Sequence, residues 1–182
     1  MKLVIGLSGR MGAGKGTVAD FLIREYGAQC RRYSDILSDL LRRLHLPVER
    51  RSLQMMGATL REVFGEDVLV QAMEGDLREA EADVVIVDGV RYPNEVRMLR
   101  GFEEGILFFV DAPAKVRFER IRKRGEKGEA EITFEEFLQA ERRETERHLD
   151  EIREMADYRL DNSGSFEDLY RQVREALKEH GL

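Results

Sequence analysis

The residues with the clearest chemical potential lie near the start of the chain, in a glycine-rich segment that ends in a lysine, a glycine and a threonine. Glycines let a backbone curl until successive N–H groups point inward, which creates a cradle for a polyphosphate. A lysine at this place can reach the β- and γ-phosphates, and the start of the following helix adds partial positive charge. The segment therefore predicts a loop that binds ATP, made of Gly9, Gly12, Ala13, Gly14, Lys15, Gly16 and Thr17.

The surroundings of this loop support the prediction. An apolar run at 3–7 predicts a strand before it, and residues 17–26 carry a helical pattern after it, which is the order that a phosphate-binding loop requires. The position after Lys15 is Gly16 instead of Ser or Thr, and Thr17 comes one residue later. In this detail the loop resembles that of adenylate kinases. The resemblance implies that Mg²⁺ is held by Thr17, or through water by the neighbours of Gly16.

A carboxylate follows the second clear strand. Residues 84–87 form a continuous apolar run, and Asp88 comes directly after it. Because ligands of open α/β sheets bind at the carboxyl ends of the strands, Asp88 is expected near the loop, where it would help to position Mg²⁺. The alternative interpretation is an ordinary turn or helix-capping aspartate.

The segment that begins at Asp88 resembles two nucleotide kinase motifs. Its sequence, Asp-Gly-Val-Arg-Tyr-Pro-Asn-Glu, is similar to the Asp-Gly-Phe-Pro-Arg of adenylate kinases and closer to the Asp-Val-Arg-Phe-Pro-Asn-Glu of deoxynucleoside monophosphate kinases. The resemblance implies that Arg91 meets the phosphate of the acceptor. A planar guanidinium that keeps its charge suits that task. A plain surface arginine is the alternative.

A long helical insert, 34–80, separates the second strand from the third. Nucleoside monophosphate kinases bind their acceptor in this region, and residues 50–61 resemble the Arg, Leu-Gln, Gly, Arg series of the deoxynucleoside monophosphate kinases. The resemblance implies acceptor contacts from Arg51, Gln54 and Arg61. Asp35 could also touch the acceptor, although an aspartate at a helix start has an equally good structural role, with Ser34 as the helix cap.

Residues 117–147 are expected to form a lid. A basic helix end runs into a loop rich in glycine and charge, and a polar helical stretch follows. Phosphoryl transfer needs cations around the transferred group, so Arg120, Arg124 and Arg143 are lid candidates. These arginines could instead pair with Glu141, Glu144 and Glu146 on an ordinary surface helix.

The segment from 133 onward resembles dephospho-coenzyme A kinases and an archaeal family of P-loop kinases. A helical pattern covers 133–155, and an Asn-Ser-Gly-Ser run occupies 162–165. The resemblance implies that this run borders the adenine of ATP.

The elements that must position these residues alternate between strand and helix. Apolar runs at 3–7, 84–87 and 106–110 predict strands buried on both faces, and weaker candidates lie at 29–33 and 158–160. Helical patterns fill the intervals, with capping residues at Thr133 and Ser165. The order predicts one domain over 1–182, with a three-layer α/β fold of the P-loop type around a parallel sheet of five strands.

Composition narrows the class further. The 182 residues carry a net charge of −6, so binding to polymeric nucleic acid or an anionic membrane is not expected. A single cysteine excludes an intrachain disulfide, and no apolar run is long enough to span a bilayer. We therefore expect a soluble cytoplasmic protein, either a monomer or a homodimer.

Together these patterns predict a kinase that moves the terminal phosphoryl group of ATP onto a small phosphorylated acceptor, expected to be a nucleoside or deoxynucleoside monophosphate. Two alternatives stay open. One is a kinase with another acceptor, such as dephospho-coenzyme A. The other is a P-loop ATPase or a nucleotide-binding module that uses no small acceptor.

Overall fold

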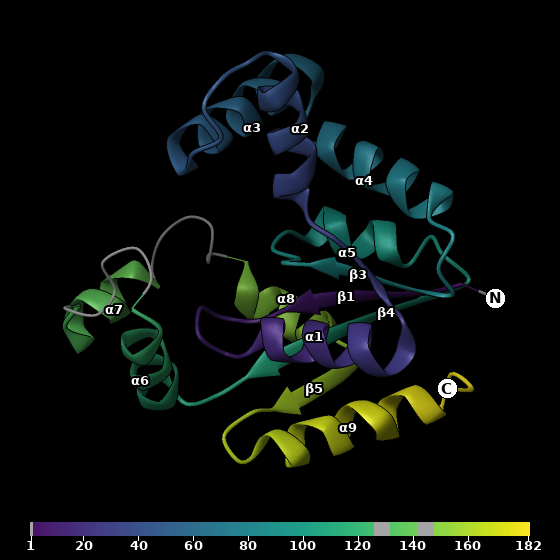
Figure 1. Ribbon diagram of the computed structural model, residues 1–182, viewed down its shortest axis with the longest axis vertical. Helices are drawn as coiled ribbons and strands as arrows, with labels where there is room; N and C mark the ends of the chain where they lie inside the picture. Colours follow the sequence, from purple (N-terminus) through teal and green to yellow (C-terminus); the bar gives the residue numbers. More distant parts are fainter. Residues whose placement is uncertain (1, 126–131, 142–147) are drawn as a thin grey trace.

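The computed structural model describes residues 2–125, 132–141 and 148–182. Its centre is a sheet of five parallel strands: β1 (Leu3–Ser8), β2 (Gln29–Arg31), β3 (Val84–Asp88), β4 (Glu104–Asp111) and β5 (Tyr158–Asp161). They lie in the order β2-β3-β1-β4-β5, which places the first strand in the middle (Figure 1). The five predicted strands and their parallel arrangement are confirmed.

Helices cover both faces of this sheet and give the three layers that the sequence predicts (Figure 1). One face packs against α1 (Lys15–Tyr26) and α9 (Phe166–Lys178), and the other against α4 (Val68–Glu79), α5 (Pro93–Leu99) and α8 (Leu149–Met155). Successive side chains of a strand point to opposite faces, so β1 sends Ile5 into one apolar cluster and Val4 into the other. This explains why its sequence is apolar throughout.

The helical insert follows β2 and consists of α2 (Tyr33–Arg43), α3 (Arg50–Phe64) and α4. Figure 1 shows α2 and α3 standing away from the sheet. Helix α2 begins earlier than predicted, because Arg32 and not Ser34 is its cap. The Asp35 carboxylate accepts a hydrogen bond of 3.2 Å from the backbone N–H of Arg32, so Asp35 has the structural role at the helix start.

The region predicted as a lid contains α6 (Ala114–Arg124) and α7 (Phe134–Ala140). Phe118 of α6 contacts Phe134 and Phe137 of α7, with ring centroids 5.2 and 5.7 Å apart. The helical pattern at 133–155 corresponds to two helices, α7 and α8, in the described part of the chain. The predicted Thr133 cap is confirmed by its bond to the Glu136 backbone N–H. No helix among the described residues is long and apolar enough to cross a membrane.

Candidate functional site

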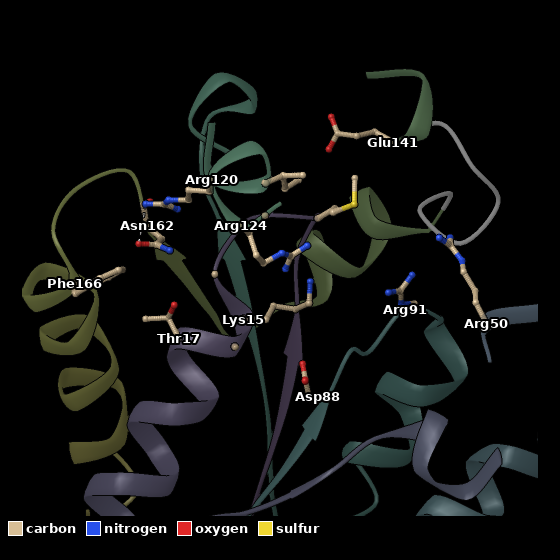
Figure 2. Close-up of a pocket in the computed structure, with 15 residues that line it drawn as sticks. Lys15, Thr17, Arg50, Asp88, Arg91, Arg120, Arg124, Glu141, Asn162 and Phe166 are labelled. Carbon is tan, nitrogen blue, oxygen red and sulfur yellow. Dashed lines mark hydrogen bonds between the residues drawn. The ribbon is translucent and has the colours of Figure 1, made fainter. Parts of the chain in front are cut away.

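A cavity of about 620 Å³ opens at the carboxyl ends of the strands. Figure 2 shows side chains from the loop after β1, the end of β3, α3, α6 and the start of α9 around it. Four arginines line it, and Asp88 is part of its wall. The lining residues are Met11, Gly12, Gly14, Lys15, Gly16, Thr17, Arg50, Asp88, Arg91, Arg120, Ile121, Arg124, Glu141, Asn162 and Phe166.

The loop between β1 and α1 adopts a backbone conformation that only glycine accommodates at two positions. Gly14 caps α1 with φ of 105°, and a Cβ there would lie 2.1 Å from Asn162 Nδ2. Gly9 has φ of 141° and passes so close to β4 that a Cβ would lie 2.2 Å from the Val110 carbonyl oxygen. Gly16 has open space around it. The shape of the loop therefore depends on Gly9 and Gly14, whereas packing does not require Gly16.

Lys15 and Thr17 both lie on the wall of the cavity (Figure 2). The Lys15 ammonium donates to the backbone carbonyl oxygen of Gly9 at 2.6 Å. This bond keeps the amine over the loop whose N–H groups would hold phosphates. Ala13, which was predicted with the loop, is fully buried and packs into the apolar core beneath it.

Asn162, directly after β5, anchors the loop. Its side chain is 1% exposed, and Nδ2 donates to the Ala13 carbonyl oxygen at 2.7 Å. Arg120 Nη2 in turn donates to the Asn162 carbonyl oxygen at 2.8 Å. The other terminal nitrogen of Arg120, Nη1, is buried and has no hydrogen-bond partner among the described residues. A phosphate oxygen is the kind of acceptor that would satisfy it.

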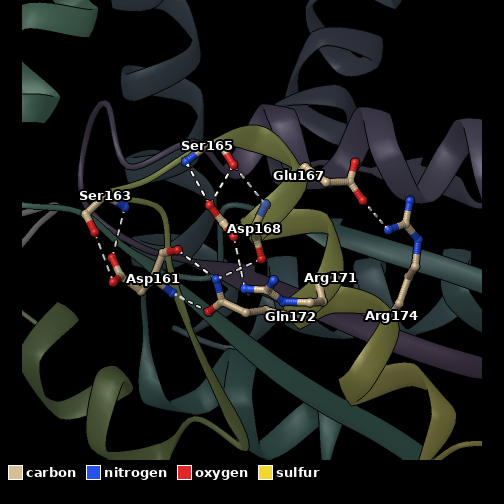
Figure 3. A network of polar contacts seen from close by, with 8 residues as sticks. All are labelled: Asp161, Ser163, Ser165, Glu167, Asp168, Arg171, Gln172 and Arg174. Carbon is tan, nitrogen blue, oxygen red and sulfur yellow. Dashed lines mark hydrogen bonds and ion pairs between the residues drawn. The ribbon is translucent and has the colours of Figure 1, made fainter.

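A polar network fixes the turn from β5 to α9 (Figure 3). The Gln172 amide accepts from the Asp161 backbone N–H and donates to the Asp161 carbonyl oxygen, both at 2.9 Å. Ser165 caps α9 by accepting from the Asp168 backbone N–H, as predicted. Phe166, the first residue of α9, is thereby held at the rim of the cavity with 59% of its surface exposed. The sequence prediction missed Phe166, which stands directly after the predicted run at 162–165.

Asp88 ends β3, and its side chain is 16% exposed. Oδ2 accepts a hydrogen bond of 2.9 Å from Arg32 Nε, a contact that the sequence prediction missed. The sequence contained a signal for this contact: β2 ends at Arg31 and Arg32 follows directly, and β2 lies parallel to β3 with Arg31 opposite Val87. Asp88 therefore has both a place in the cavity wall and a cationic neighbour.

Arg91 reaches the cavity from the segment between β3 and α5, which Glu95 holds in place. The Glu95 side chain is 4% exposed, and its Oε2 accepts from the backbone N–H groups of Arg91 at 2.6 Å and Tyr92 at 3.2 Å. Burial raises the pKa of Glu95 to about 7, against the opposing effects of these hydrogen bonds and of the Arg61 and Arg91 charges. Glu95 is therefore a buried titratable group that is hydrogen-bonded to the backbone of Arg91, a residue of the cavity wall.

Stability is expected to fall between about pH 4.5 and pH 7 because of Glu95. Its pKa is higher in the folded than in the unfolded chain, so its contribution is complete below the unfolded pKa and is lost as pH rises through 7. Urea denaturation measures this effect as the drop in the free energy of unfolding between pH 5 and pH 8.5. The drop should be roughly 2–3 kcal/mol larger in the wild type than in Glu95→Gln, since 1.36 kcal/mol corresponds to one pKa unit. Exposed Glu103→Gln is the control, and equal losses in wild type and Glu95→Gln would contradict the assignment.

Several predicted acceptor residues lie outside the cavity wall. Asp35 accepts from the backbone N–H of Arg32 at the start of α2, and Arg51 and Gln54 are exposed on α3, where Arg50 lines the cavity in their place. Arg61 lies 5.7 Å above the ring of Tyr92 and donates to the Gly57 carbonyl oxygen at 3.3 Å. The structure therefore gathers Arg91, Arg120 and Arg124 from the predicted set. Arg143 lies outside the described residues.

Arg117 links α6 and α7 to the loop between β1 and α1. It is 4% exposed, and it donates to the carbonyl oxygens of Ala112 at 2.8 Å and Met11 at 3.2 Å. It also forms an ion pair with Glu141, directly after α7. Its contacts therefore join α6, the residue after α7 and the loop.

The residues present suit a Mg²⁺ ion that arrives with a nucleotide better than one held by protein alone. No group of three or more His, Cys, Asp or Glu residues that could hold a metal occurs within 2–125, 132–141 and 148–182. Mg²⁺ commonly takes only one or two protein ligands and completes its shell with water and phosphate oxygens. The Thr17 hydroxyl and the Asp88 carboxylate, on the same cavity wall, meet that need.

Comparisons with known proteins agree with this geometry. A family model described as "AAA domain" matches residues 5–144. A UPF0200 protein of Staphylothermus marinus is 32% identical over 179 residues, which are 98% of this chain and 93% of that protein.

Solved structures share the fold. Shikimate kinase from Bacteroides thetaiotaomicron superposes with a TM-score of 0.59 at 19% identity, covering 99% of both chains. TT1252 from Thermus thermophilus gives a TM-score of 0.53 at 26% identity, covering 98% of this chain and 97% of that one. The chain therefore belongs to the family described as "AAA domain" and to the UPF0200 family, and it has a kinase-like P-loop fold.

Proposed function

We propose that this protein is an ATP-dependent phosphotransferase whose acceptor is a small phosphorylated molecule, most simply a nucleoside or deoxynucleoside monophosphate. The observation that carries the proposal is the cavity itself. It joins the phosphate loop to Asp88 and to Arg50, Arg91, Arg120 and Arg124. A hydrolase needs to bind only one polyphosphate. Arg50 from α3 and Arg91 from the segment before α5 add positive charge that suits a second anionic ligand, as a transferase requires.

On the nucleotide side, the loop N–H groups and Lys15 bind the phosphates of ATP. Thr17 and Asp88 would hold a Mg²⁺ ion, which would supply positive charge to the phosphates. Arg120 offers its buried Nη1 to a phosphate oxygen, and Arg124 adds a second positive charge from the same helix. Catalysis of phosphoryl transfer consists mainly of such positioning and charge neutralisation.

On the acceptor side, Arg91 and Arg50 bind the phosphate of the acceptor. Arg50 begins α3 inside the helical insert, whereas Arg91 lies between β3 and α5. Guanidinium groups bind a phosphate through paired, directional hydrogen bonds. Arg61, stacked on Tyr92, supports the segment that carries Arg91. Closure of α6 and α7 over both ligands would exclude water and limit ATP hydrolysis.

The test is ADP formation by the purified protein with ATP and Mg²⁺ in the presence of one acceptor at a time. The panel contains nucleoside and deoxynucleoside monophosphates, dephospho-coenzyme A and, as an acceptor without phosphate, shikimate. The proposal predicts strong stimulation by one phosphorylated acceptor and formation of its phosphorylated product, identified by mass spectrometry. Equal ADP formation with and without every acceptor would identify an ATPase and refute the transferase.

Phe166 is expected to stack on the base of ATP. It is an exposed aromatic ring in the cavity lining, near Asn162 and Arg120 (Figure 2). Stacking of a base on an aromatic side chain contributes about 1–3 kcal/mol, so Phe166→Ala should raise the KM for ATP by about 5- to 150-fold. Steady-state kinetics measures this. Phe64→Ala, which removes another exposed ring, on α3, is the control and should not change the KM.

A further inference from the structure

Asp88 has a cationic partner that the proposed transfer does not use. Arg32 Nε donates to Asp88 Oδ2 at 2.9 Å. Strand β2 runs parallel to β3 with Arg31 opposite Val87, and the next residue along each chain segment, Arg32 after β2 and Asp88 at the end of β3, meets the other in this hydrogen bond. Strand register therefore directs this guanidinium to the carboxylate.

The two partners face different surroundings. The Asp88 side chain is 16% exposed and lines the cavity, whereas the Arg32 side chain is 51% exposed and is not part of the cavity wall. An ion pair with one half-exposed member contributes at most about 1 kcal/mol, because water screens it and ordering the arginine costs entropy. Such a weak pair positions the carboxylate, but a cation that binds the carboxylate more strongly can displace the arginine.

Arg32 also belongs to the start of the acceptor insert. Its backbone N–H donates to Asp35, which fixes the first turn of α2. The guanidinium that bonds Asp88 therefore belongs to the residue at which the insert begins, and it is not part of the cavity wall. A divalent cation bound to the nucleotide would approach the same carboxylate from the loop and would be repelled by a guanidinium already bonded to Oδ2.

We propose that Arg32 is a displaceable counter-ion of Asp88, a positioning residue that competes with the nucleotide-bound divalent cation for this carboxylate. The inference rests on the proposed function, because it assigns Asp88 to the cation. Two opposite predictions distinguish it from a supporting role. If Arg32 competes, its removal strengthens cation binding, and if Arg32 only holds Asp88 in a useful orientation, its removal weakens cation binding.

The experiment measures Mn²⁺ binding directly, by electron paramagnetic resonance, with a non-hydrolysable ATP analogue present. Arg32→Gln is expected to tighten Mn²⁺ binding by about 3- to 5-fold, the equivalent of an exposed ion pair. Arg32→Lys keeps the charge and should stay near the wild type. Arg31→Gln is the matched control, since it removes the same charge from the neighbouring residue, whose hydrogen bonds go to Cys30 and Gln29 and not to Asp88. Should Arg32→Gln fail to fold, Arg32→Met keeps most of the apolar stem and serves the same purpose.

A double-mutant cycle shows whether the effect passes through Asp88. In the Asp88→Asn background, Arg32→Gln should leave Mn²⁺ affinity unchanged, because the competition has been removed. Unchanged or weaker binding in Arg32→Gln, or an equal effect in both backgrounds, would overturn the inference. If the wild type transfers phosphate and binds Mn²⁺ while Arg32→Gln behaves like Arg31→Gln, only this inference fails. If the wild type neither binds Mn²⁺ with the analogue nor transfers phosphate, the proposed function fails as well.

Discussion

Lys15→Ala is expected to reduce the kcat of phosphoryl transfer by at least about 100-fold. Loss of one preorganised donor to a developing charge typically costs a factor of about 10²–10³, and Lys15 carries a full positive charge. The variant should still fold, because the bond that the ammonium donates to the Gly9 carbonyl oxygen contributes only about 1 kcal/mol. Comparing kcat with the free energy of unfolding in urea therefore separates a catalytic loss from a structural one.

Two further variants sharpen this comparison. Lys15→Arg keeps the charge on a longer, planar group and should recover only part of the activity, since the loop is shaped around an ammonium. Lys178→Ala removes an exposed lysine near the end of α9, far from the loop in sequence, and should leave kcat unchanged. Activity of Lys15→Ala within threefold of the wild type would refute the role of the loop in transfer.

Gly14→Ala is expected to have the largest structural effect on the site. The new Cβ would lie 2.1 Å from Asn162 Nδ2, at a φ of 105° that L-residues rarely adopt. Either the loop or Asn162 must move, which breaks the bond from Asn162 to the Ala13 carbonyl oxygen. We expect a loss of about 2–4 kcal/mol of unfolding free energy and of most nucleotide affinity, measured by urea denaturation and by titration with a fluorescent ATP analogue.

Gly16→Ala is the matched stability control. It lies two residues later in the same segment, its Cβ would meet nothing within 4 Å, and alanine favours a helix more than glycine does. Its unfolding free energy should be equal to that of the wild type or higher. Asn162→Ala should remove the collision, so that the double variant with Gly14→Ala is less destabilised than the sum of the two single variants. Strict additivity would show that the collision does not account for the loss.

The strands and the phosphate loop could be predicted because their signals are local. A strand buried on both faces is apolar along its whole length, as in 84–87, and the end of a parallel strand next to the loop identifies Asp88 as part of the site. The caps at Thr133 and Ser165 are equally local, since each depends on a carboxylate three residues later.

Local sequence patterns do not predict which arginine of the insert faces the cavity. Arg50 and Arg51 are adjacent on α3, and their side chains point about 100° apart around the helix. The sequence favoured Arg51, but the packing of α3 against α2 and α4 turns Arg50 toward the cavity. The sequence left two roles open for Asp35, a contact with the acceptor and a structural role at the helix start. In the structure its carboxylate accepts from the Arg32 backbone N–H, which is the structural role.

By itself, therefore, the sequence determined the layered α/β fold, the position of the phosphate loop and the edge of the sheet at which ligands bind, because each follows from patterns within a few residues. Only the tertiary structure decided which cations surround that loop. The contacts of Arg32 with Asp88 and of Asn162 with Ala13 join residues 56 and 149 positions apart. Their formation depends on strand register and helix packing, which no local pattern specifies.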